Sequence, residues 1–189
     1  MTYRHSFVLG LMMITSLSCT SQSLWGASEI NTYTQTDFAM DTVVSETLYT
    51  TGEDITADVI ATLKNVEENL ISWTEESSQI YQINQNAGST VTVSQETAAY
   101  LKQVLKLSEA SEGAMDPTIG KIIRLWDIDG ENPHIPEEKE LNALLKNVGY
   151  KKIILDGNKV TLPAGMTLDL GAAGKGIGCD AAEQILEKQ

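Results

Sequence analysis

The stretch TLDLGAAGKGIGCDAAEQIL, residues 167–186, carries the residue types best suited to binding a phosphate group. Four glycines fall between residues 171 and 178, where an apolar run meets a helical pattern. Glycines at such a junction let a ligand approach the backbone closely, and phosphate is the usual ligand. Asp169 and Lys175 add a carboxylate and a cation. A tight turn that packs the helix against a strand is the alternative, and the stretch alone leaves both open.

Three further segments hold residues that could contact a ligand, and each also has a purely structural interpretation. Met40, in the segment AMDTV, is either a core residue or a ligand contact. Trp73 ends a long amphipathic pattern, so it is either a core tryptophan or a flat face for an aromatic ring. Asp116 precedes a proline, which disfavours helical backbone at the residue before it, and could simply cap a turn. Read singly, none of these segments identifies a function.

The composition excludes two classes of binding surface. The chain has 189 residues, of which 13 are basic and 26 acidic, with a formal net charge of −13. Nucleic-acid surfaces normally show a basic patch and anionic membranes attract polybasic faces, and the sequence has no Lys/Arg cluster. No nucleic-acid partner is therefore expected. A phosphate ligand would need backbone N–H groups, Lys175 or a metal cation to offset its charge.

The N-terminal region predicts export and lipid anchoring. Residues 1–18 join a short polar start to an apolar run that is too short to span a bilayer and is typical of a secretory signal peptide. Small residues and Cys19 follow, resembling a lipobox with cleavage before Cys19 and lipid on its sulfur. The exported protein would then be anchored to a bacterial membrane and face the periplasm. Ordinary signal-peptidase cleavage nearby is the alternative. Residues 19–36, rich in Ser, Thr, Gln and Asn, are expected to form a tether.

The remaining residues, 37–189, are predicted to form one α+β domain. The expected elements, in chain order, are a strand over 38–50, a helix over 54–73, a helix capped by Ser94, a helix from Pro136 to Gly149, a hairpin around 156–158, a strand ending at Leu170, and a glycine-rich loop before a last helix. Hairpins and helices occur together without the regular βαβ alternation of a parallel sheet, so we expect a mixed sheet with flanking helices.

Taken together, the four segments resemble the ApbE family, the FAD:protein FMN transferases. That family has an M-[GD]-T strand, an aromatic-rich segment with Ser and a closing Asn, a G-[AF]-x-D-x-T-[VI]-G segment followed by Trp, and an L-D-L-G-x-x-[AG]-K-G-x-x-x-D segment. The matching stretches here are residues 40–42, 73–84, 113–120 with Trp126, and 168–180. The third and fourth matches are the specific ones, and the resemblance covers about residues 38–189.

The resemblance implies an ApbE-like, T-fold-like FAD-binding domain and a Mg²⁺-dependent enzyme. Such an enzyme transfers FMN from FAD to a threonine hydroxyl of an acceptor flavoprotein and releases AMP. The positions that match FAD contacts of the family are Met40, Trp73, Ala114, Met115, Asp116, Asp169 and Lys175. Ala172 matches a position whose backbone carbonyl binds the metal. In this interpretation the glycines let a loop present carbonyl and N–H groups to a metal-bound diphosphate.

Two alternatives to a transferase remain open at this level. One is an FAD pyrophosphatase, which uses water in place of threonine, and the other is a non-catalytic periplasmic flavin-binding lipoprotein. The family continues with a His-x-x-[DN]-P-x-[ST]-G segment and with an Asp and a Thr that complete its metal site, and neither is in this sequence. The chain is therefore expected to correspond to the N-terminal portion of such a protein, with a domain that is incomplete at its C-terminus.

Overall fold

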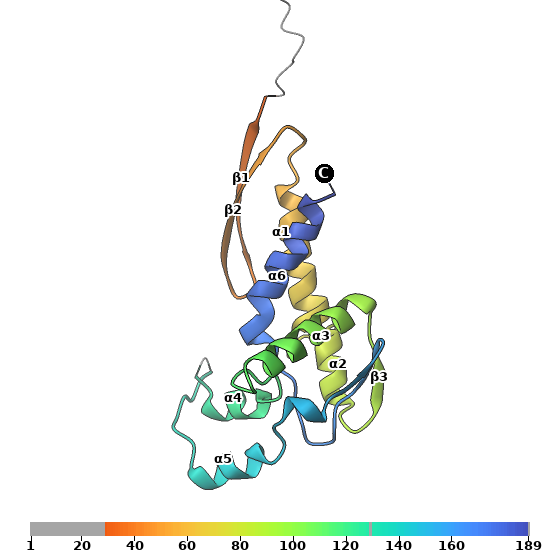
Figure 1. The fold of residues 1–189 in the computed structure, drawn as a ribbon. Helices are drawn as coiled ribbons and strands as arrows, with labels where there is room; N and C mark the ends of the chain where they lie inside the picture. Colours follow the sequence, from red (N-terminus) through yellow and green to blue (C-terminus); the bar gives the residue numbers. More distant parts are fainter. Residues whose placement is uncertain (1–28, 129, 189) are drawn as a thin grey trace, which may run out of the picture.

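A computed structural model describes residues 29–128 and 130–188 as a two-stranded arm lying on helices, joined to a body of helices and short strands (Figure 1). The predicted signal peptide, 1–18, and Cys19 lie outside the described residues. The elements, in chain order, are β1 (Asn31–Ala39), β2 (Thr42–Thr50), α1 (Thr56–Asn65), the π-helical η1 (Val66–Ile71), α2 (Gln79–Gln85), β3 (Thr90–Thr92), α3 (Gln95–Ala110), α4 (Gly120–Trp126), α5 (Glu138–Leu145), the 3-10 turn η2 (Tyr150–Lys152), β4 (Ile154–Asp156), β5 (Lys159–Thr161) and α6 (Gly171–Leu186).

The first two strands form an antiparallel hairpin where the sequence predicted one strand over 38–50. That prediction is wrong because Met40 and Asp41 reverse the chain. Both residues have positive φ, 56° and 54°, as in the type I′ turn that matches the twist of a two-stranded hairpin. Residues 31–36, which composition assigned to the tether, belong to β1. Their alternating exposed and half-buried side chains place one face of the strand against the protein.

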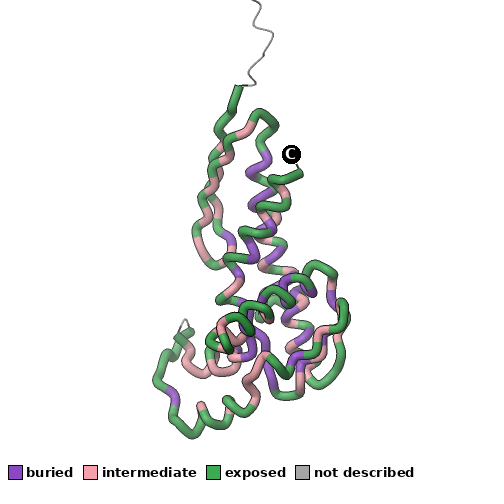
Figure 2. Tube along the Cα trace, in the orientation of Figure 1, coloured by how far each residue is buried: buried purple, intermediate pink, exposed green. Residues whose placement is uncertain are grey.

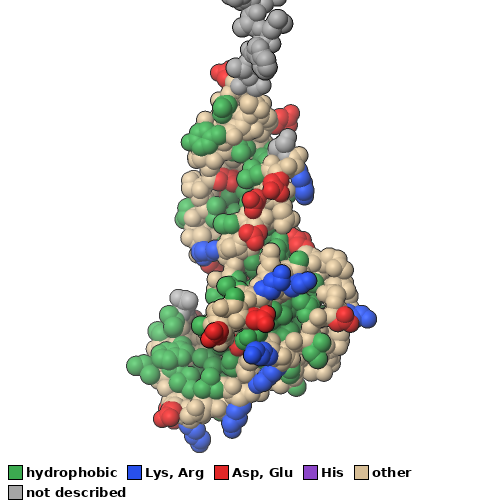
Figure 3. Space-filling model, in the orientation of Figure 1, with side chains coloured by type: hydrophobic (Ala, Val, Ile, Leu, Met, Phe, Trp, Pro, Cys, Tyr) green, Lys and Arg blue, Asp and Glu red, His purple; other side chains and the backbone are tan. Residues whose placement is uncertain are grey.

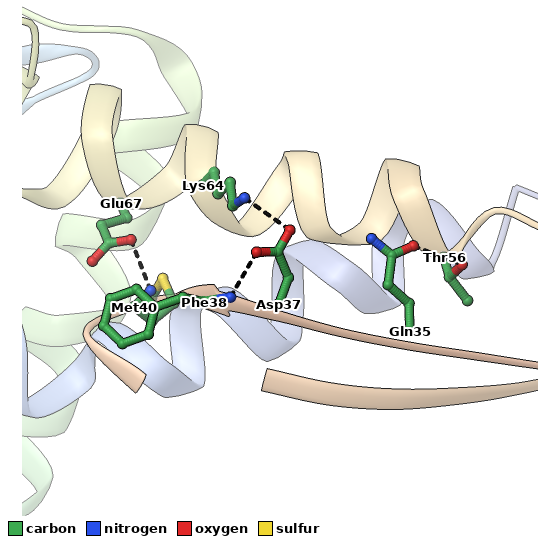
Figure 4. A network of polar contacts seen from close by, with 7 residues as sticks. All are labelled: Gln35, Asp37, Phe38, Met40, Thr56, Lys64 and Glu67. Carbon is green, nitrogen blue, oxygen red and sulfur yellow. Dashed lines mark hydrogen bonds and ion pairs between the residues drawn. The ribbon is translucent and has the colours of Figure 1, made fainter. Parts of the chain in front are cut away.

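The hairpin lies along α1 and α6 (Figure 1). Polar side chains bond it to α1 (Figure 4). Lys64 Nζ lies 2.9 Å from Asp37 Oδ2, and this hydrogen bond lowers the pKa of the Asp37 carboxyl. Thr56 Oγ1 donates to Gln35 Oε1 at 3.0 Å. Exposed ion pairs contribute little stability, so these contacts orient the hairpin more than they hold it. The helix predicted over 54–73 is confirmed as α1 continued by η1.

The body contains a second antiparallel sheet, with strand order β3-β5-β4. Gly157, at φ 58°, makes the β4–β5 turn and confirms the hairpin predicted around 156–158. Ser94 accepts a backbone N–H of the first turn of α3 at 3.0 Å, which confirms the predicted cap. Among the described residues, one isolated bridge between Ile119 and Thr167 is parallel. These small sheets and their helices confirm the α+β class.

The main hydrophobic core lies in the body (Figure 2), where α2, α3, β5 and α6 enclose residues 166–170. The sequence predicted those residues as a strand. That prediction is wrong: these residues form a single bridge, at Thr167, and a side chain pairs with the backbone of Leu168 where a neighbouring strand would have done so. Asn84 Oδ1 accepts the Leu168 N–H at 2.7 Å, and Asn84 Nδ2 donates to the Leu168 carbonyl at 2.9 Å. The Asp169 N–H donates to the Pro117 carbonyl at 2.8 Å.

The glycines of 171–178 lie in the first half of α6, so the predicted glycine-rich loop is wrong. All four keep negative φ. Two of them, Gly174 and Gly178, pack closely on η1 and α1. A Cβ on Gly174 would lie 3.3 Å from Ile71 Cδ1, and a Cβ on Gly178 would lie 3.1 Å from Leu63 Cδ2. The packing alternative that the sequence left open therefore describes Gly174 and Gly178.

Apolar side chains gather at one corner of the surface, over α4 and α5 (Figure 3). The exposed ones of these helices and their connection, between 43% and 84% exposed, are Ile123, Ile128, Ile135 and Leu145. The helix predicted from Pro136 to Gly149 is confirmed in its central part as α5, which contributes no buried residue to the core. Apolar side chains gathered in this way are typical of interaction surfaces.

Candidate functional site

A cavity of about 160 Å³ opens where the β1–β2 turn, the end of η1 and the start of α6 meet. Its lining residues are Met40, Asp41, Glu67, Ile71, Ser72, Trp73, Thr74, Gly171, Gly174 and Lys175. Three of the predicted ligand contacts, Met40, Trp73 and Lys175, are among them. Lys175 follows Met40 by 135 residues, so the fold alone brings these side chains together.

Lys175 is the single basic residue among the described residues that line this cavity. Its Nζ donates to the Met40 carbonyl at 3.2 Å, which fixes an otherwise flexible cation at the cavity wall. Asp41 and Glu67 are also among the residues that line this cavity. A diphosphate bound here would therefore lie near one basic and two acidic residues, and it would need further positive charge of the kind a divalent cation supplies.

Trp73 stands between this cavity and a second one of about 420 Å³, which Arg124, Asn84 and Thr167 help to line. The Arg124 guanidinium covers the indole, with Cζ 4.5 Å from the ring centroid, within cation–π range. Burial lowers the pKa of Arg124, and the nearby charge of Asp169 opposes that effect. The core-tryptophan interpretation is wrong, because Trp73 lies in the bend after η1 and is 37% exposed. Its ring is held as an apolar surface at both cavities.

Ala114, Met115 and Asp116 do not line the cavity of about 160 Å³ that contains Lys175, which we call the Lys175 cavity. The Asp116 carboxylate accepts the Thr118 N–H at 2.8 Å and the Tyr150 N–H at 2.9 Å. These bonds organise the loop before α4, as the turn-capping alternative expected. Met115 packs against the core and Ala114 is exposed. Their contact with a flavin nucleotide stays a prediction.

Asp169 and Ala172 lie near the start of α6 but outside the Lys175 cavity. Asp169 is buried, and its Oδ1 accepts the Gly171 N–H at 2.8 Å, which places a negative charge at the positive end of the helix. Ala172 lines another cavity of about 300 Å³, between α3 and α6. A carbonyl in the first turn of a helix accepts the N–H four residues later, so that of Ala172 already has a backbone partner.

The described residues contain no cluster of metal-binding side chains at the predicted Mg²⁺ position. Within 29–128 and 130–188, no group of three or more His, Cys, Asp or Glu side chains is arranged to hold a metal ion. Mg²⁺ requires near-octahedral oxygen coordination, and one helical carbonyl at Ala172 does not provide it. Metal binding at Ala172 therefore stays a prediction from the family resemblance.

Sequence reasoning missed Asp41, Glu67 and Arg124 at this site. Glu67 bonds to the backbone of Met40, 27 residues earlier, and Arg124 stacks on Trp73 from another helix. No spacing rule connects either pair. No local signal marked these residues, because the turn that brings Glu67 to Met40 and Asp41 lacks the glycine or asparagine that normally indicates a tight turn.

A family model described as the ApbE family matches residues 40–189, which include every residue that lines the Lys175 cavity. The chain belongs to the ApbE family. An FAD:protein FMN transferase from Treponema pallidum is 28% identical over 189 aligned positions, covering 92% of this chain and 52% of that protein. One from Vibrio cholerae is 29% identical over 132 positions, covering 67% and 39%.

Solved structures of the ApbE family show the same fold. The crystal structure of the ApbE protein from Thermotoga maritima matches with a TM-score of 0.77 at 30% identity, covering 82% of this chain and 52% of that one. The flavin transferase ApbE from Vibrio cholerae also matches with a TM-score of 0.77, at 23% identity, covering 85% and 55%. This ApbE chain spans about half the length of these proteins.

Proposed function

We propose that this chain provides the FAD-binding part of an FAD:protein FMN transferase. Its ApbE relatives that bear this name support the proposal. The structural observation that carries it is the meeting of Met40, Trp73 and Lys175 at one cavity. An aromatic face beside an ammonium suits a ligand that joins a planar ring to a phosphate. At about 160 Å³ the cavity is smaller than the roughly 300–1,000 Å³ typical of small-molecule sites, so it would hold one part of FAD.

The proposed reaction moves FMN from FAD to a threonine hydroxyl of an acceptor flavoprotein. The threonine oxygen bonds to the FMN phosphorus while the bond from that phosphorus to the bridging oxygen breaks. AMP leaves with the bridging oxygen, and the hydroxyl proton passes to a base. Lys175 is our candidate for stabilising negative charge on the phosphates, because an ammonium held in place acts without reorganisation. We propose Mg²⁺ as cofactor, with the Ala172 carbonyl as its one candidate ligand among the described residues.

Replacing Trp73 by alanine should weaken FAD binding by about 1 kcal/mol or more if the ring stacks on the flavin or adenine. This corresponds to roughly a fivefold rise in the dissociation constant. Trp73→Phe keeps an aromatic face and should retain much of the affinity. Calorimetry with FAD and with FMN is the measurement, and FAD should bind more tightly because its AMP half adds contacts. Equal affinities for FAD and FMN would contradict the assignment.

Incubation of the protein with FAD, Mg²⁺ and an acceptor flavoprotein tests the reaction. FMN linked to the acceptor indicates transfer. Free FMN and AMP indicate an FAD pyrophosphatase, and unchanged FAD that stays with the protein indicates a flavin-binding lipoprotein without catalysis. The proposed function is wrong if either of these two alternatives is found.

Lys175→Ala and Asp169→Asn should each slow this transfer on the order of tenfold or more, as removal of a charge-stabilising group does. The Lys175→Ala variant lacks the ammonium that we place on the phosphates. The Asp169→Asn variant lacks the carboxylate that we place against a donor group of FAD. Thermal melts of both variants separate lost activity from lost folding. Wild-type transfer rates in both variants would show that the site is assigned to the wrong residues.

We also propose that the protein is exported and anchored to a bacterial membrane by lipid on Cys19, facing the periplasm. Support comes from the short apolar run and the small residues before Cys19. In the part of the chain that the structure describes, no helix has both the length and the apolar character to cross a membrane. In a bacterial host, mass spectrometry should find Cys19 as the first residue of the mature chain, with lipid attached. A mature chain that begins downstream of Cys19 would refute this.

A further inference from the structure

Glu67 joins two walls of the Lys175 cavity. Its Oε2 accepts the Met40 N–H at 2.7 Å (Figure 4), and its Oε1 accepts the Asp41 N–H at 3.1 Å. Its backbone carbonyl accepts the Ser72 N–H at 2.9 Å, which closes the π-helical turn leading to Trp73. The residue therefore contacts the hairpin turn through its side chain and the Trp73 bend through its backbone.

The hairpin turn needs such an acceptor because of its own residues. Type I′ turns favour Asn-Gly, since both central residues take positive φ. Here Met40 and Asp41 occupy these positions, and a side chain with a Cβ is strained there. The N–H groups of both residues donate to the Glu67 carboxylate. Hydrogen bonds to a carboxylate are stronger than neutral ones, so Glu67 offsets the strain and holds the turn against η1.

The same turn also holds the Lys175 ammonium. The Met40 carbonyl accepts from Lys175 Nζ at 3.2 Å, so the position of this carbonyl decides where the ammonium lies. If the turn moved, Lys175 would lose its anchor, because no other side-chain hydrogen bond to its Nζ is found among the described residues.

We propose that Glu67 is a positioning residue of the FAD site. Its carboxylate fixes the turn at Met40 and Asp41, and the turn in turn fixes Lys175 at the cavity wall. The link to FAD rests on the proposed function. Its carboxylate accepts two backbone N–H groups, and we place its effect on FAD through the turn and Lys175.

The test is the affinity of the full chain for FAD, measured by calorimetry well below the melting temperature. Glu67→Ala should weaken FAD binding on the order of tenfold, the scale of one lost hydrogen bond to a charged group. Glu68→Ala removes the same charge from the adjacent, exposed position and should leave the affinity unchanged. Since Glu67 acts through Lys175, the double variant with Lys175→Ala should bind FAD as weakly as Lys175→Ala alone. A lower melting temperature with wild-type affinity for FAD would overturn the proposal.

A rescue experiment separates positioning from general stability. Glycine at position 41 adopts positive φ without strain. In a chain that carries Asp41→Gly, adding Glu67→Ala should therefore weaken FAD binding much less than it does in the wild-type chain. If Glu67→Ala weakens binding equally in both chains, the turn does not transmit the effect and the proposal fails.

Amide hydrogen exchange tests the turn without FAD. Protection of the Met40 and Asp41 amides should be lost in Glu67→Ala and kept in Glu68→Ala, and unchanged protection in Glu67→Ala would overturn the proposal. If the wild-type chain does not bind FAD, the proposed function is wrong, and hydrogen exchange still decides whether Glu67 holds the turn.

Discussion

Replacing Asn84 by alanine should lower the free energy of unfolding by about 2–6 kcal/mol, because it leaves two buried main-chain groups unpaired and each costs about 1–3 kcal/mol. The Asn84 amide bonds to both the N–H and the carbonyl of Leu168, at 2.7 and 2.9 Å. Leu168 is fully buried, so water cannot replace either bond. The loss should also loosen residues 166–170, which lead directly into Asp169 and α6.

Chemical denaturation of the full chain measures this effect, and Asn86→Ala is the matched control. Asn86 also donates to a backbone carbonyl, that of Gln82, but it is exposed and water can replace its bond. Asn84→Asp refines the test, because it keeps an acceptor for the Leu168 N–H but sets a carboxylate against the Leu168 carbonyl. The Asn84→Asp variant should be less stable than wild type at neutral pH. At acidic pH the new carboxyl is protonated, and the difference in unfolding free energy from wild type should become smaller. Equal costs for Asn84→Ala and Asn86→Ala would contradict this account.

Replacing Gly178 by valine should destabilise the chain on the order of 2 kcal/mol, the typical cost of overpacking a close contact. A Cβ at Gly178 would lie 3.1 Å from Leu63 Cδ2 and 3.2 Å from Met40 Cε, and valine adds two more methyl groups there. Gly176 lies on the same helix, yet a Cβ there meets nothing within 4 Å. Gly176→Ala should therefore stabilise the chain by about 0.5–1 kcal/mol through helix propensity alone.

Thermal and chemical unfolding of the two glycine variants distinguish helix packing from backbone freedom. If the glycines formed a flexible ligand loop, a side chain at Gly176 would also be harmful and Gly178 would not stand apart. Similar losses in Gly178→Val and Gly176→Ala would thus refute the packing account. Because Gly178 also touches Met40, FAD affinity measured on the Gly178 variant should fall together with its stability.

Features that depend on a few neighbouring residues could be predicted from the sequence. The Ser94 cap, the Gly157 hairpin and the helix over 54–73 each follow from local chemistry, and the structure confirms them. The motif residues also indicated the family. The Met40–Asp41 turn was missed because neither residue is the glycine or asparagine that normally marks a tight turn, and its acceptor, Glu67, lies on a helix that follows the hairpin.

Other features were decided by tertiary structure. The glycines of 171–178 suggested a phosphate loop, but close packing of α6 on α1 and η1 accounts for Gly174 and Gly178. Residues 166–170 had the apolar pattern of a strand, but Asn84 satisfies the backbone that a neighbouring strand would have paired.

The sequence by itself determined the Ser94 cap, the Gly157 turn and the helix over 54–73, because these depend on contacts a few positions apart, and it supplied the residue types of the candidate site. Only the tertiary structure decided which of those residues meet. Lys175 donates to the Met40 carbonyl, 135 positions away in the sequence. Asp116 accepts the Tyr150 N–H instead and does not line the cavity. Such long-range pairs form when apolar faces of different elements pack together. That packing depends on how all core side chains fit together, and the spacing of neighbouring residues does not determine it.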